Sequence, residues 1–395
     1  MPPRYRWAAR APEEGAEARR TELVTVTTVP VWDRAEGAAG STAPSGTFDV
    51  VVDADVLGRH RTGDETYVAN LLRELAAQQA AHGLRVAATS RHPELVPEGI
   101  AAMHLPARSQ ALRMAVALPR IARRSARLLH TQYVVPPGVR GPTVVTVHDL
   151  SFEHHPEWMA PHDRVLFQTL VPRAVRRAAR VLTVSETTCQ DIVERYRVAP
   201  ERVVVTHNGV DDRFRPDGPR LDRSPFLLFV GALHPRKGLP TALEALARLP
   251  DAPPLLVVGP AKHGAPAVEA AVARLGLEHR VELAGHVDDA ELAQLYRSAE
   301  AFVFPSLFEG FGLPVVEAMA SGTPVVTTTA GSLPEVAGGA AVLVPPGDAA
   351  ALADGIEQAL SDASSWRAAG LANAARFRWD ALARRTAGVY REVLG

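Results

Sequence analysis

Residues 304–322 read FPSLFEGFGLPVVEAMASG, and this stretch carries the signals that decide the fold. The apolar run at residues 301–304 leads into it and predicts a buried strand. Pro314 suits the first turn of a helix, where its missing N–H costs nothing. Glu309 then lies in the loop, and Glu317 lies about one turn inside the helix. The stretch therefore predicts a strand–loop–helix unit of a parallel α/β sheet.

The same alternation of short β-branched runs and longer helical stretches extends outward, beginning at Phe48. A polar, turn-rich segment at residues 211–219 separates two sets of strands. We therefore predict two doubly wound, Rossmann-like domains at residues 48–210 and 219–375, after a disordered extension at residues 1–47. The expected strands are 49–53, 85–89, 128–131, 143–147, 180–184 and 203–206, then 226–230, 255–259, 281–283, 301–304, 324–328 and 341–344.

The loop between residues 304 and 314 has the chemistry of a ligand site. Ligands of open α/β sheets bind beyond the carboxyl ends of strands. Gly310 and Gly312 let a ligand approach backbone N–H groups, and a helix N-terminus there favours phosphate. Helical side chains lean toward the N-terminus, so Glu317 can join Glu309 in binding sugar hydroxyls. Alternatively, Glu317 caps its own helix and Glu309 is solvated. The combination favours a nucleotide-sugar.

Residues 285–322 resemble the donor-binding region of the retaining GT-B glycosyltransferases of family 4. The resemblance rests on Gly285-His286-Val287, on Pro305-Ser306, and on the seven residues between Glu309 and Glu317. It implies that Glu309 contacts the transferred sugar and that Glu317 holds the nucleotide ribose. The donor-site residues that it implies in this region are His286, Val287, Glu309, Gly310, Phe311, Gly312, Leu313 and Glu317.

A second matching stretch, at residues 229–239, reads FVGALHPRKGL and follows the first strand of the second domain. Two cations at a helix start can neutralise a diphosphate and stabilise it as a leaving group, a task that other transferases give to a divalent metal. A solvated helix start would instead favour acidic residues. The resemblance implies that Arg236 and Lys237 bind the diphosphate next to Gly231. No metal or other cofactor is expected besides the co-substrate.

In the first domain, residues 143–150 read TVVTVHDL. A lone histidine in such a place is commonly a packing residue, but the resemblance implies that His148 faces the donor sugar and that Asp149 orients it. Two loop residues, Gly63 and Asn208, are further candidates, although Asn208 equally suits a plain turn. Glu65 occupies a position that is frequently glycine in the family. An acid beside a diphosphate is unfavourable unless it faces away, so the Gly63 loop is expected to serve the acceptor.

The matches cover nearly everything after the extension and imply two facing domains, with the segment 376–395 returning to the first. They imply a metal-independent hexosyltransferase that moves a sugar, with retention, from a nucleoside diphosphate to a glycan or lipid-linked acceptor, as in polysaccharide biosynthesis. Members with a similar His-Asp-Leu often use GDP-mannose, which we favour over UDP-glucose. Two alternatives stay open: a nucleotide-sugar epimerase of the same fold, and a non-catalytic sugar-nucleotide binder. The second is disfavoured by the joint presence of His148, Arg236, Lys237, Glu309 and Glu317.

Composition excludes other classes. Lys and Arg number 43 against 44 Asp and Glu, so the chain lacks the basic excess of a nucleic-acid binder.

The phosphate-loop and dinucleotide-binding glycine patterns are absent from the sequence. Asp53-Ala54-Asp55 fits a strand-end turn better than a metal site, and His154-His155 has no partner at metal-ligand spacing. A single cysteine, Cys189, and the absence of an export signal or a long apolar run lead us to expect a cytoplasmic protein.

One basic stretch, at residues 108–127, stands out in this neutral chain. No acidic residue occurs between Glu98 and Asp149. Interleaved apolar residues predict an amphipathic helix within residues 110–129, which Pro119 should kink. The face is either solvated or makes peripheral contact with anionic lipid at the inner face of the membrane. The arginines of the stretch are Arg108, Arg113, Arg120, Arg123, Arg124 and Arg127.

Overall fold

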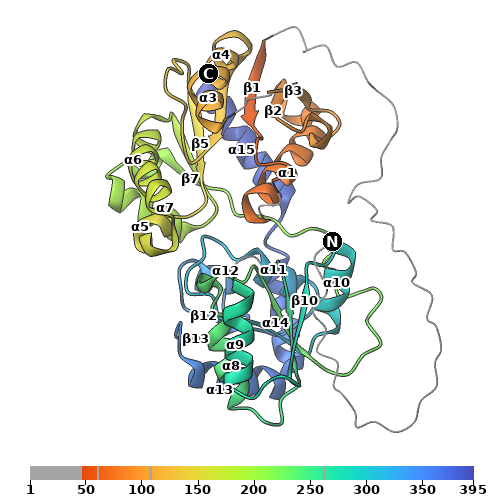
Figure 1. Cartoon of the computed structure of the whole chain (residues 1–395). Coiled ribbons are helices and arrows are strands. Elements are labelled where there is room, and N and C mark those ends of the chain that lie inside the picture. The colour runs from red at the N-terminus through yellow and green to blue at the C-terminus, as the bar shows by residue number, and fades with distance from the viewer. Residues whose placement is uncertain (1–46, 60–61, 106–108, 261–263) are drawn as a thin grey trace, which may run out of the picture.

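The computed structural model describes residues 47–59, 62–105, 109–260 and 264–395. It shows two α/β domains joined by two crossings of the chain, the first at residues 206–226 and the second at residues 375–378 (Figure 1). The extension predicted at residues 1–47 lies outside the described residues, except for Thr47.

The first domain is built on a seven-stranded sheet in which every pairing is parallel. The strand order β3-β2-β1-β4-β5-β6-β7 places the first strand near the middle. Val50, Val51 and Val52 are fully buried, because helices cover both faces of a parallel sheet. The strands are β1 (Phe48–Asp53), β2 (Val86–Ser90), β3 (Ala101–His104), β4 (Ala126–Gln132), β5 (Thr143–Val147), β6 (Arg180–Thr183) and β7 (Val203–Val205).

The second domain is built on a six-stranded parallel sheet with the order β10-β9-β8-β11-β12-β13. The direction of winding reverses between β8 and β11, which is the place where ligands of such sheets bind. The strands are β8 (Leu227–Val230), β9 (Leu255–Val258), β10 (Val281–Gly285), β11 (Ala301–Phe304), β12 (Val325–Thr328) and β13 (Val342–Val344).

Helices connect the strands in both domains. In the first domain they are α1 (Thr62–Ala77), α2 (Gln79–His82), α3 (Gln110–Leu112), α4 (Leu118–Ser125), α5 (Ser151–His154), α6 (Pro161–Arg177) and α7 (Glu186–Tyr196). The remaining helices are α8 (Leu239–Ala247), α9 (Ala265–Arg274), α10 (Asp289–Ser298), α11 (Leu313–Ala320), α12 (Leu333–Ala337), α13 (Ala349–Ser361), α14 (Ala363–Ala374) and α15 (Trp379–Leu394).

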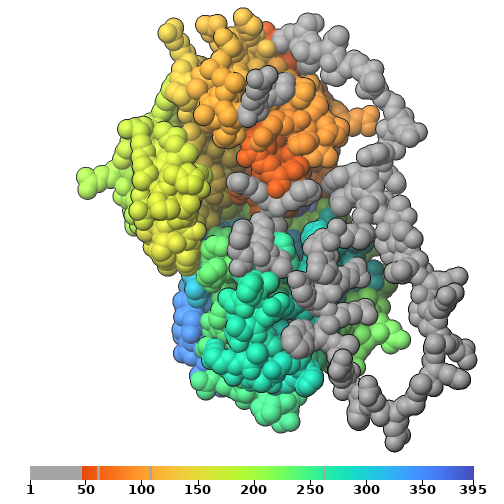
Figure 2. All heavy atoms as spheres, viewed as in Figure 1, coloured from red at the N-terminus to blue at the C-terminus, as the bar shows by residue number. Residues whose placement is uncertain are grey.

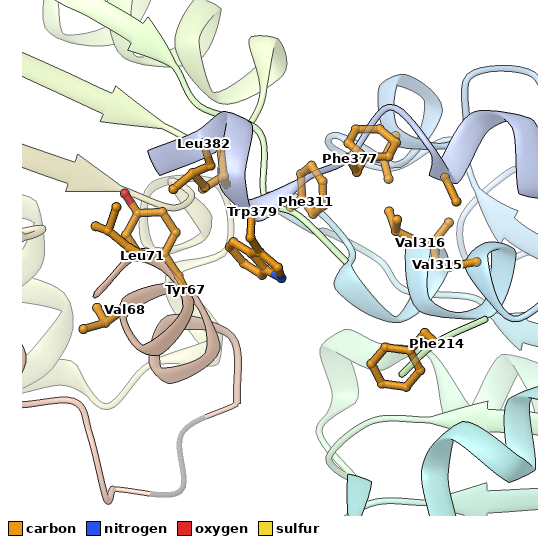
Figure 3. Close-up of a cluster of buried hydrophobic side chains, with 14 of the residues drawn as sticks. Tyr67, Val68, Leu71, Phe214, Phe311, Val315, Val316, Phe377, Trp379 and Leu382 are labelled. Carbon is orange, nitrogen blue, oxygen red and sulfur yellow. The ribbon is translucent and has the colours of Figure 1, made fainter. Parts of the chain in front are cut away.

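The two crossings lie against each other. A Cβ at Gly209 would lie 2.1 Å from the backbone nitrogen of Trp379, so only glycine allows this approach. Figure 3 shows Trp379 between Tyr67 of α1 and Phe377 of the second crossing. The C-terminal helix α15 then packs against α1, so the predicted return of the last helix to the first domain is confirmed.

The predicted fold class is confirmed, and all twelve predicted strands are found with ends shifted by at most two residues. One strand, β3, was missed. Its sequence, AAMH, contains no β-branched or aromatic residue, and it forms the edge of the sheet beyond β2. A strand of this composition gives no local signal, because pairing with β2 rather than propensity holds it.

The prediction for the basic stretch is corrected in two respects. Arg113 is 4% exposed and points inward, where its NH1 lies 2.6 Å from Asp53 Oδ1. The helical part ends at Ser125, and Arg127 belongs to β4. Pro119 comes just after a π-helical stretch, Arg113–Ala117, so the regular helix is interrupted next to the proline but the chain stays helical to Ser125. Arg108 lies outside the described residues.

Candidate active site

Five of the polar residues singled out from the sequence gather where the two domains meet: His148, Asp149, Arg236, Lys237 and Glu309. The space-filling view shows the yellow-green part of the first domain touching the green part of the second (Figure 2). The loops after β5, β8 and β11 all reach this boundary, and contacts between their residues join the domains.

Lys237 and Glu309 form the central ion pair. Lys237 Nζ lies 2.6 Å from Glu309 Oε1, and the Ser306 hydroxyl donates to the same oxygen at 2.6 Å. Lys237 ends a short 3₁₀ turn after β8, and Glu309 follows β11. Because β8 and β11 are neighbours, the sheet brings the two side chains together.

Burial and neighbouring charges set the protonation of this pair. Glu309 is 7% exposed. Burial would raise its pKa, but Lys237 and Arg236 outweigh that effect and hold the pKa of Glu309 below its usual value. Burial lowers the pKa of Lys237, Glu309 opposes this, and Arg236 adds to it. Glu309 is therefore an ionised carboxylate at neutral pH, held by two cations.

Residues 310–313 form a backbone cradle beside Glu309. Gly312 has a φ of 99°, in the left-handed region that favours glycine. In the part of the chain that the structure describes, the N–H groups of Gly310, Phe311, Gly312 and Leu313 have no hydrogen-bond acceptor. They lie at the N-terminus of α11, where such groups can bind phosphate. The cradle can therefore hold an anion next to Lys237.

Only the backbone of Phe311 is available to a ligand. Its ring is buried and lies 5.4 Å from the ring of Phe377, edge to face, in the apolar cluster between the domains (Figure 3). The side chain thus fixes the cradle to the second crossing of the chain.

The first domain contributes the loop after β5. A Cβ at Gly310 would lie 2.2 Å from the carbonyl oxygen of His148, so glycine lets the two domains touch. His148 Nε2 lies 2.8 Å from Gln132 Oε1, so Gln132, rather than Asp149, contacts the ring. Asp149 Oδ2 instead lies 3.4 Å from Arg236 NH1 and links the two domains.

Glu317 has a different environment. It does not cap its own helix, since α11 has no side-chain cap. Its Oε2 accepts a hydrogen bond from the Tyr296 hydroxyl at 3.1 Å. Burial raises the pKa of Glu317 to about 7, the Tyr296 bond opposes this, and the charges of Asp289 and Asp211 add to it. Glu317 therefore titrates near neutral pH.

The other predicted donor residues lie on either side of this centre. Gly231 borders the stem of Lys237, because a Cβ there would lie 3.6 Å from Lys237 Cγ. His286 is exposed and Val287 is half-buried in the loop after β10. Strands β9 and β8 lie between β10 and β11, and among the described residues no hydrogen bond or ion pair joins His286 or Val287 to Lys237 or Glu309.

The two loop candidates of the first domain are not brought to the ion pair. Gly63 is exposed in the first turn of α1, with open space where a Cβ would be. Asn208 is 4% exposed in the first crossing, and its Oδ1 has no partner among the described residues. Glu65 Oε1 accepts the N–H of Gly58 at 2.7 Å and thus binds within its own loop.

Several site residues were not predicted. Ser306 stood inside the quoted stretch, but its bond to Glu309 depends on the folded loop. Ser332 donates both its N–H and its hydroxyl to the Glu309 carbonyl at 3.0 Å, and no local signal could have shown this. Tyr133 has a φ of 57°, and its ring lies 5.6 Å from that of His148. Sequence spacing alone does not give such contacts between distant segments.

Within residues 47–59, 62–105, 109–260 and 264–395, no group of three or more His, Cys, Asp and Glu residues is placed to hold a metal ion. Over the same ranges, no helix has both the length and the apolar character needed to cross a membrane.

Two family models match the chain. Residues 61–214 match the model described as Glycosyltransferase Family 4, and residues 224–362 match the model described as Glycosyl transferases group 1. Among similar curated proteins, O-antigen chain mannosyltransferase B of Escherichia coli is 33% identical over 63% of this chain and 70% of its own length. The MMP alpha-(1->4)-mannosyltransferase of Mycolicibacterium hassiacum is 36% identical over 58% of this chain and 57% of its own length.

Solved structures resemble the whole described fold. The sucrose-phosphate synthase of Thermosynechococcus elongatus superposes with a TM-score of 0.71 and 24% identity, over 87% of this chain and 98% of that one. The Anabaena protein HepE, in complex with UDP and glucose, gives a TM-score of 0.70 with 20% identity, over 87% of this chain and 99% of that one.

Proposed function

The chain belongs to the group 1, family 4 glycosyltransferases, and on this basis we propose that it moves a hexose from a nucleoside-diphosphate sugar to a hydroxyl of a glycan or lipid-linked acceptor. Its two Rossmann-like domains form the GT-B fold. The observation that carries the proposal is the Lys237–Glu309 ion pair, with Arg236 beside it and the backbone cradle next to it.

Each part of this cluster matches one part of such a donor. Arg236, Lys237 and the cradle N–H groups bind the diphosphate and stabilise the charge that develops as it leaves. Glu309 accepts hydrogen bonds from hydroxyls of the transferred sugar. Glu317, further along α11, accepts from the ribose hydroxyls when it is ionised. His148 and Asp149 approach the same place from the first domain.

The reaction proposed is transfer with retention. The bond between the anomeric carbon and the diphosphate oxygen breaks, and the acceptor oxygen bonds to that carbon on the same face. The acceptor proton passes to the departing diphosphate oxygen, so no protein nucleophile is required. Because Arg236 and Lys237 already supply two positive charges, we propose that transfer needs no metal.

Mannose is the favoured sugar and GDP the favoured nucleotide. The support is that two similar proteins are named mannosyltransferases. The HepE structure contains UDP and glucose, so a UDP-sugar is the other donor to test.

Thermal-shift measurements against GDP-, UDP- and ADP-sugars test donor binding. The matching donor should raise the melting temperature, and the same donor with an acceptor should give a glycoside whose anomeric proton, seen by NMR, retains its configuration. Excess chelator should leave the rate nearly unchanged. No stabilisation by any sugar nucleotide would contradict the proposal, and turnover of donor alone into a second sugar nucleotide would indicate the epimerase.

We also propose peripheral contact with anionic membrane at the cytoplasmic face. Arg120, Arg123 and Arg124 are exposed on α4, and Leu112 nearby is 48% exposed. Each arginine near an anionic surface contributes about 1 kcal/mol. The protein should co-sediment with phosphatidylglycerol vesicles more than with phosphatidylcholine vesicles, and substitution of the three arginines by glutamine should remove the difference. Equal binding to both vesicles would reject the contact.

A further inference from the structure

Glu335 of the second domain reaches across the domain boundary. Its Oε1 accepts the N–H of Glu186 at 2.8 Å and lies 2.8 Å from His207 Nε2. Its Oε2 accepts the N–H and the hydroxyl of Thr187, both at 3.0 Å. All four donors come from the first domain or the crossing that leaves it. One carboxylate of α12 thus holds the first turn of α7.

The contact suits a carboxylate. The first N–H groups of a helix have no intrahelical acceptor and lie at the positive end of the helix dipole. The Ser185 side chain caps the N–H of Thr188 at 3.1 Å, and Glu335 takes the two N–H groups before it. Burial would raise the pKa of Glu335, but the bonds from His207, Glu186 and Thr187 hold it below its usual value. Glu335 is therefore ionised at neutral pH.

Glu335 is linked to the donor loop on its own side. Ser332, one helical turn earlier, accepts the N–H of Val336 and donates twice to the Glu309 carbonyl. A Cβ at Gly331 would lie 2.4 Å from the same carbonyl. The start of α12 therefore holds both the Glu309 backbone and the residue that reaches the first domain.

The first turn of α7 is linked in turn to His148. The Thr188 hydroxyl lies 3.5 Å from the His148 carbonyl oxygen, which is the oxygen that Gly310 approaches from the second domain. Glu335, α7, His148 and the cradle thus form a closed set of contacts around the boundary between the domains.

From these contacts we propose that Glu335 is a positioning residue, which holds His148 of the first domain and Glu309 of the second in register for sugar transfer. The inference rests on the proposed function. Without this carboxylate each domain keeps its own core, and the donor keeps its contacts with Lys237 and the cradle. The alignment between the domains loosens, so the acceptor is misplaced and water reaches the sugar more easily.

The test measures Glu335→Ala, Glu335→Asp and wild type, each with the donor that the thermal-shift measurements identify. For Glu335→Ala we expect kcat for transfer to fall about 10- to 100-fold, while the donor Kd from calorimetry changes less than about threefold. The ratio of donor hydrolysis to transfer should rise at least about fivefold. Glu335→Asp, which keeps the charge, should recover part of both effects. The ratio of hydrolysis to transfer does not depend on what fraction of the protein is correctly folded. A variant that only folds less well would therefore leave this ratio unchanged.

The matched control is Glu357→Ala, an exposed carboxylate on α13 with no hydrogen bond among the described residues, and it should behave as wild type. If Glu335→Ala does not fold, His207→Ala and Thr187→Val weaken the same contact from the first domain and should raise the ratio by smaller amounts. An unchanged ratio and kcat in a folded variant would overturn the inference. A wild type that neither transfers nor hydrolyses any sugar nucleotide would overturn the proposed function instead.

Discussion

Glu309 and Glu317 belong to the same strand–loop–helix segment, yet their surroundings give them opposite acidities. Glu309 faces Lys237 and Arg236, and its pKa is lowered. Glu317 faces a neutral hydroxyl, Tyr296, and its pKa is raised to about 7, mainly by burial. Glu309 is buried and Glu317 is half-buried, so the lower pKa belongs to the more buried group, and the difference comes from the charges around the two carboxylates and not from burial alone.

This contrast separates the parts of the site. In the proposed function, the Glu309 region is the fixed arrangement of charges that would meet the anionic and reacting end of the donor. The Glu317 region, whose pKa is raised to about 7, would meet the neutral ribose. If the two glutamates were equivalent hydroxyl acceptors, their removal would give the same kinetic result at every pH. Substitution of each residue, and the pH dependence of KM, distinguish the two cases.

Removal of Lys237 should have the largest effect. In Lys237→Ala, Glu309 loses its nearest cation and the diphosphate loses one of two, so kcat/KM for the donor should fall about 100- to 1,000-fold. The stability loss should be roughly 1–3 kcal/mol, less than for a fully buried pair, because the Lys237 side chain keeps 15% exposure. Steady-state kinetics and urea unfolding measure the two quantities.

Arg248→Ala is the control for that comparison, since Arg248 is an exposed cation at the end of α8. Arg248→Ala should change neither kcat/KM for the donor nor the free energy of unfolding. A Lys237 variant that loses stability but keeps kcat/KM would show that the ion pair serves the fold alone.

Glu309→Gln should separate binding from turnover. The amide oxygen can still accept from Ser306, but the charge that offsets Lys237 is lost, so the anionic donor should bind equally well or about threefold more tightly. Transfer needs the carboxylate at the sugar, so kcat should fall about 100-fold. Calorimetry and single-turnover kinetics give the two values. A parallel loss of donor affinity and kcat would mean that Glu309 acts mainly by holding the loop.

The sheet elements were predictable from sequence because burial on both faces imposes apolar runs of β-branched residues. Residues 143–147 and 255–258 show this pattern plainly. Strand β3 lacks it, and nothing local indicated the strand. The buried position of Arg113 was equally hidden, because an arginine is placed inward only when a partner such as Asp53 lies there.

The site was predictable in part for a related reason. Lys237 and Glu309 follow adjacent strands, and topology brings such residues together once two sheets are inferred. Contacts between the domains had no such signal. Arg236 with Asp149, and Glu335 with α7, are separated by 87 and about 149 residues and depend on how the two domains are set against each other.

Donor use should depend on pH through Glu317. An ionised Glu317 accepts ribose hydroxyls better than a protonated one, so KM for the donor should fall about tenfold between pH 6 and pH 8, with a midpoint near pH 7. Glu317→Gln should give a higher KM that no longer changes over this range. A wild-type KM that is flat with pH would show that the Glu317 charge plays no part in binding.

Ionisation of Glu317 should favour donor binding but lower the stability of the fold. The folded pKa of Glu317, about 7, lies above its usual value of 4.5, so its stabilising contribution is complete below about pH 4.5 and is lost as pH rises through 7. The melting temperature of Glu317→Gln minus that of wild type should therefore increase from pH 5 to pH 8. A gap that is constant with pH would contradict the raised pKa.

Tyr296→Phe should have the smallest effect and refines the comparison. The Tyr296 hydroxyl donates to the ionised form of Glu317 and lowers its pKa, so removal of the hydroxyl should raise the KM midpoint by about half a pH unit and reduce stability by about 1 kcal/mol. Tyr196→Phe is the control, because Tyr196 donates to Glu153 at 2.9 Å in the first domain, away from the donor. It should show a similar stability loss with an unshifted midpoint. A midpoint that moves downward in Tyr296→Phe would mean that the hydroxyl stabilises the protonated form of Glu317 and not the ionised one.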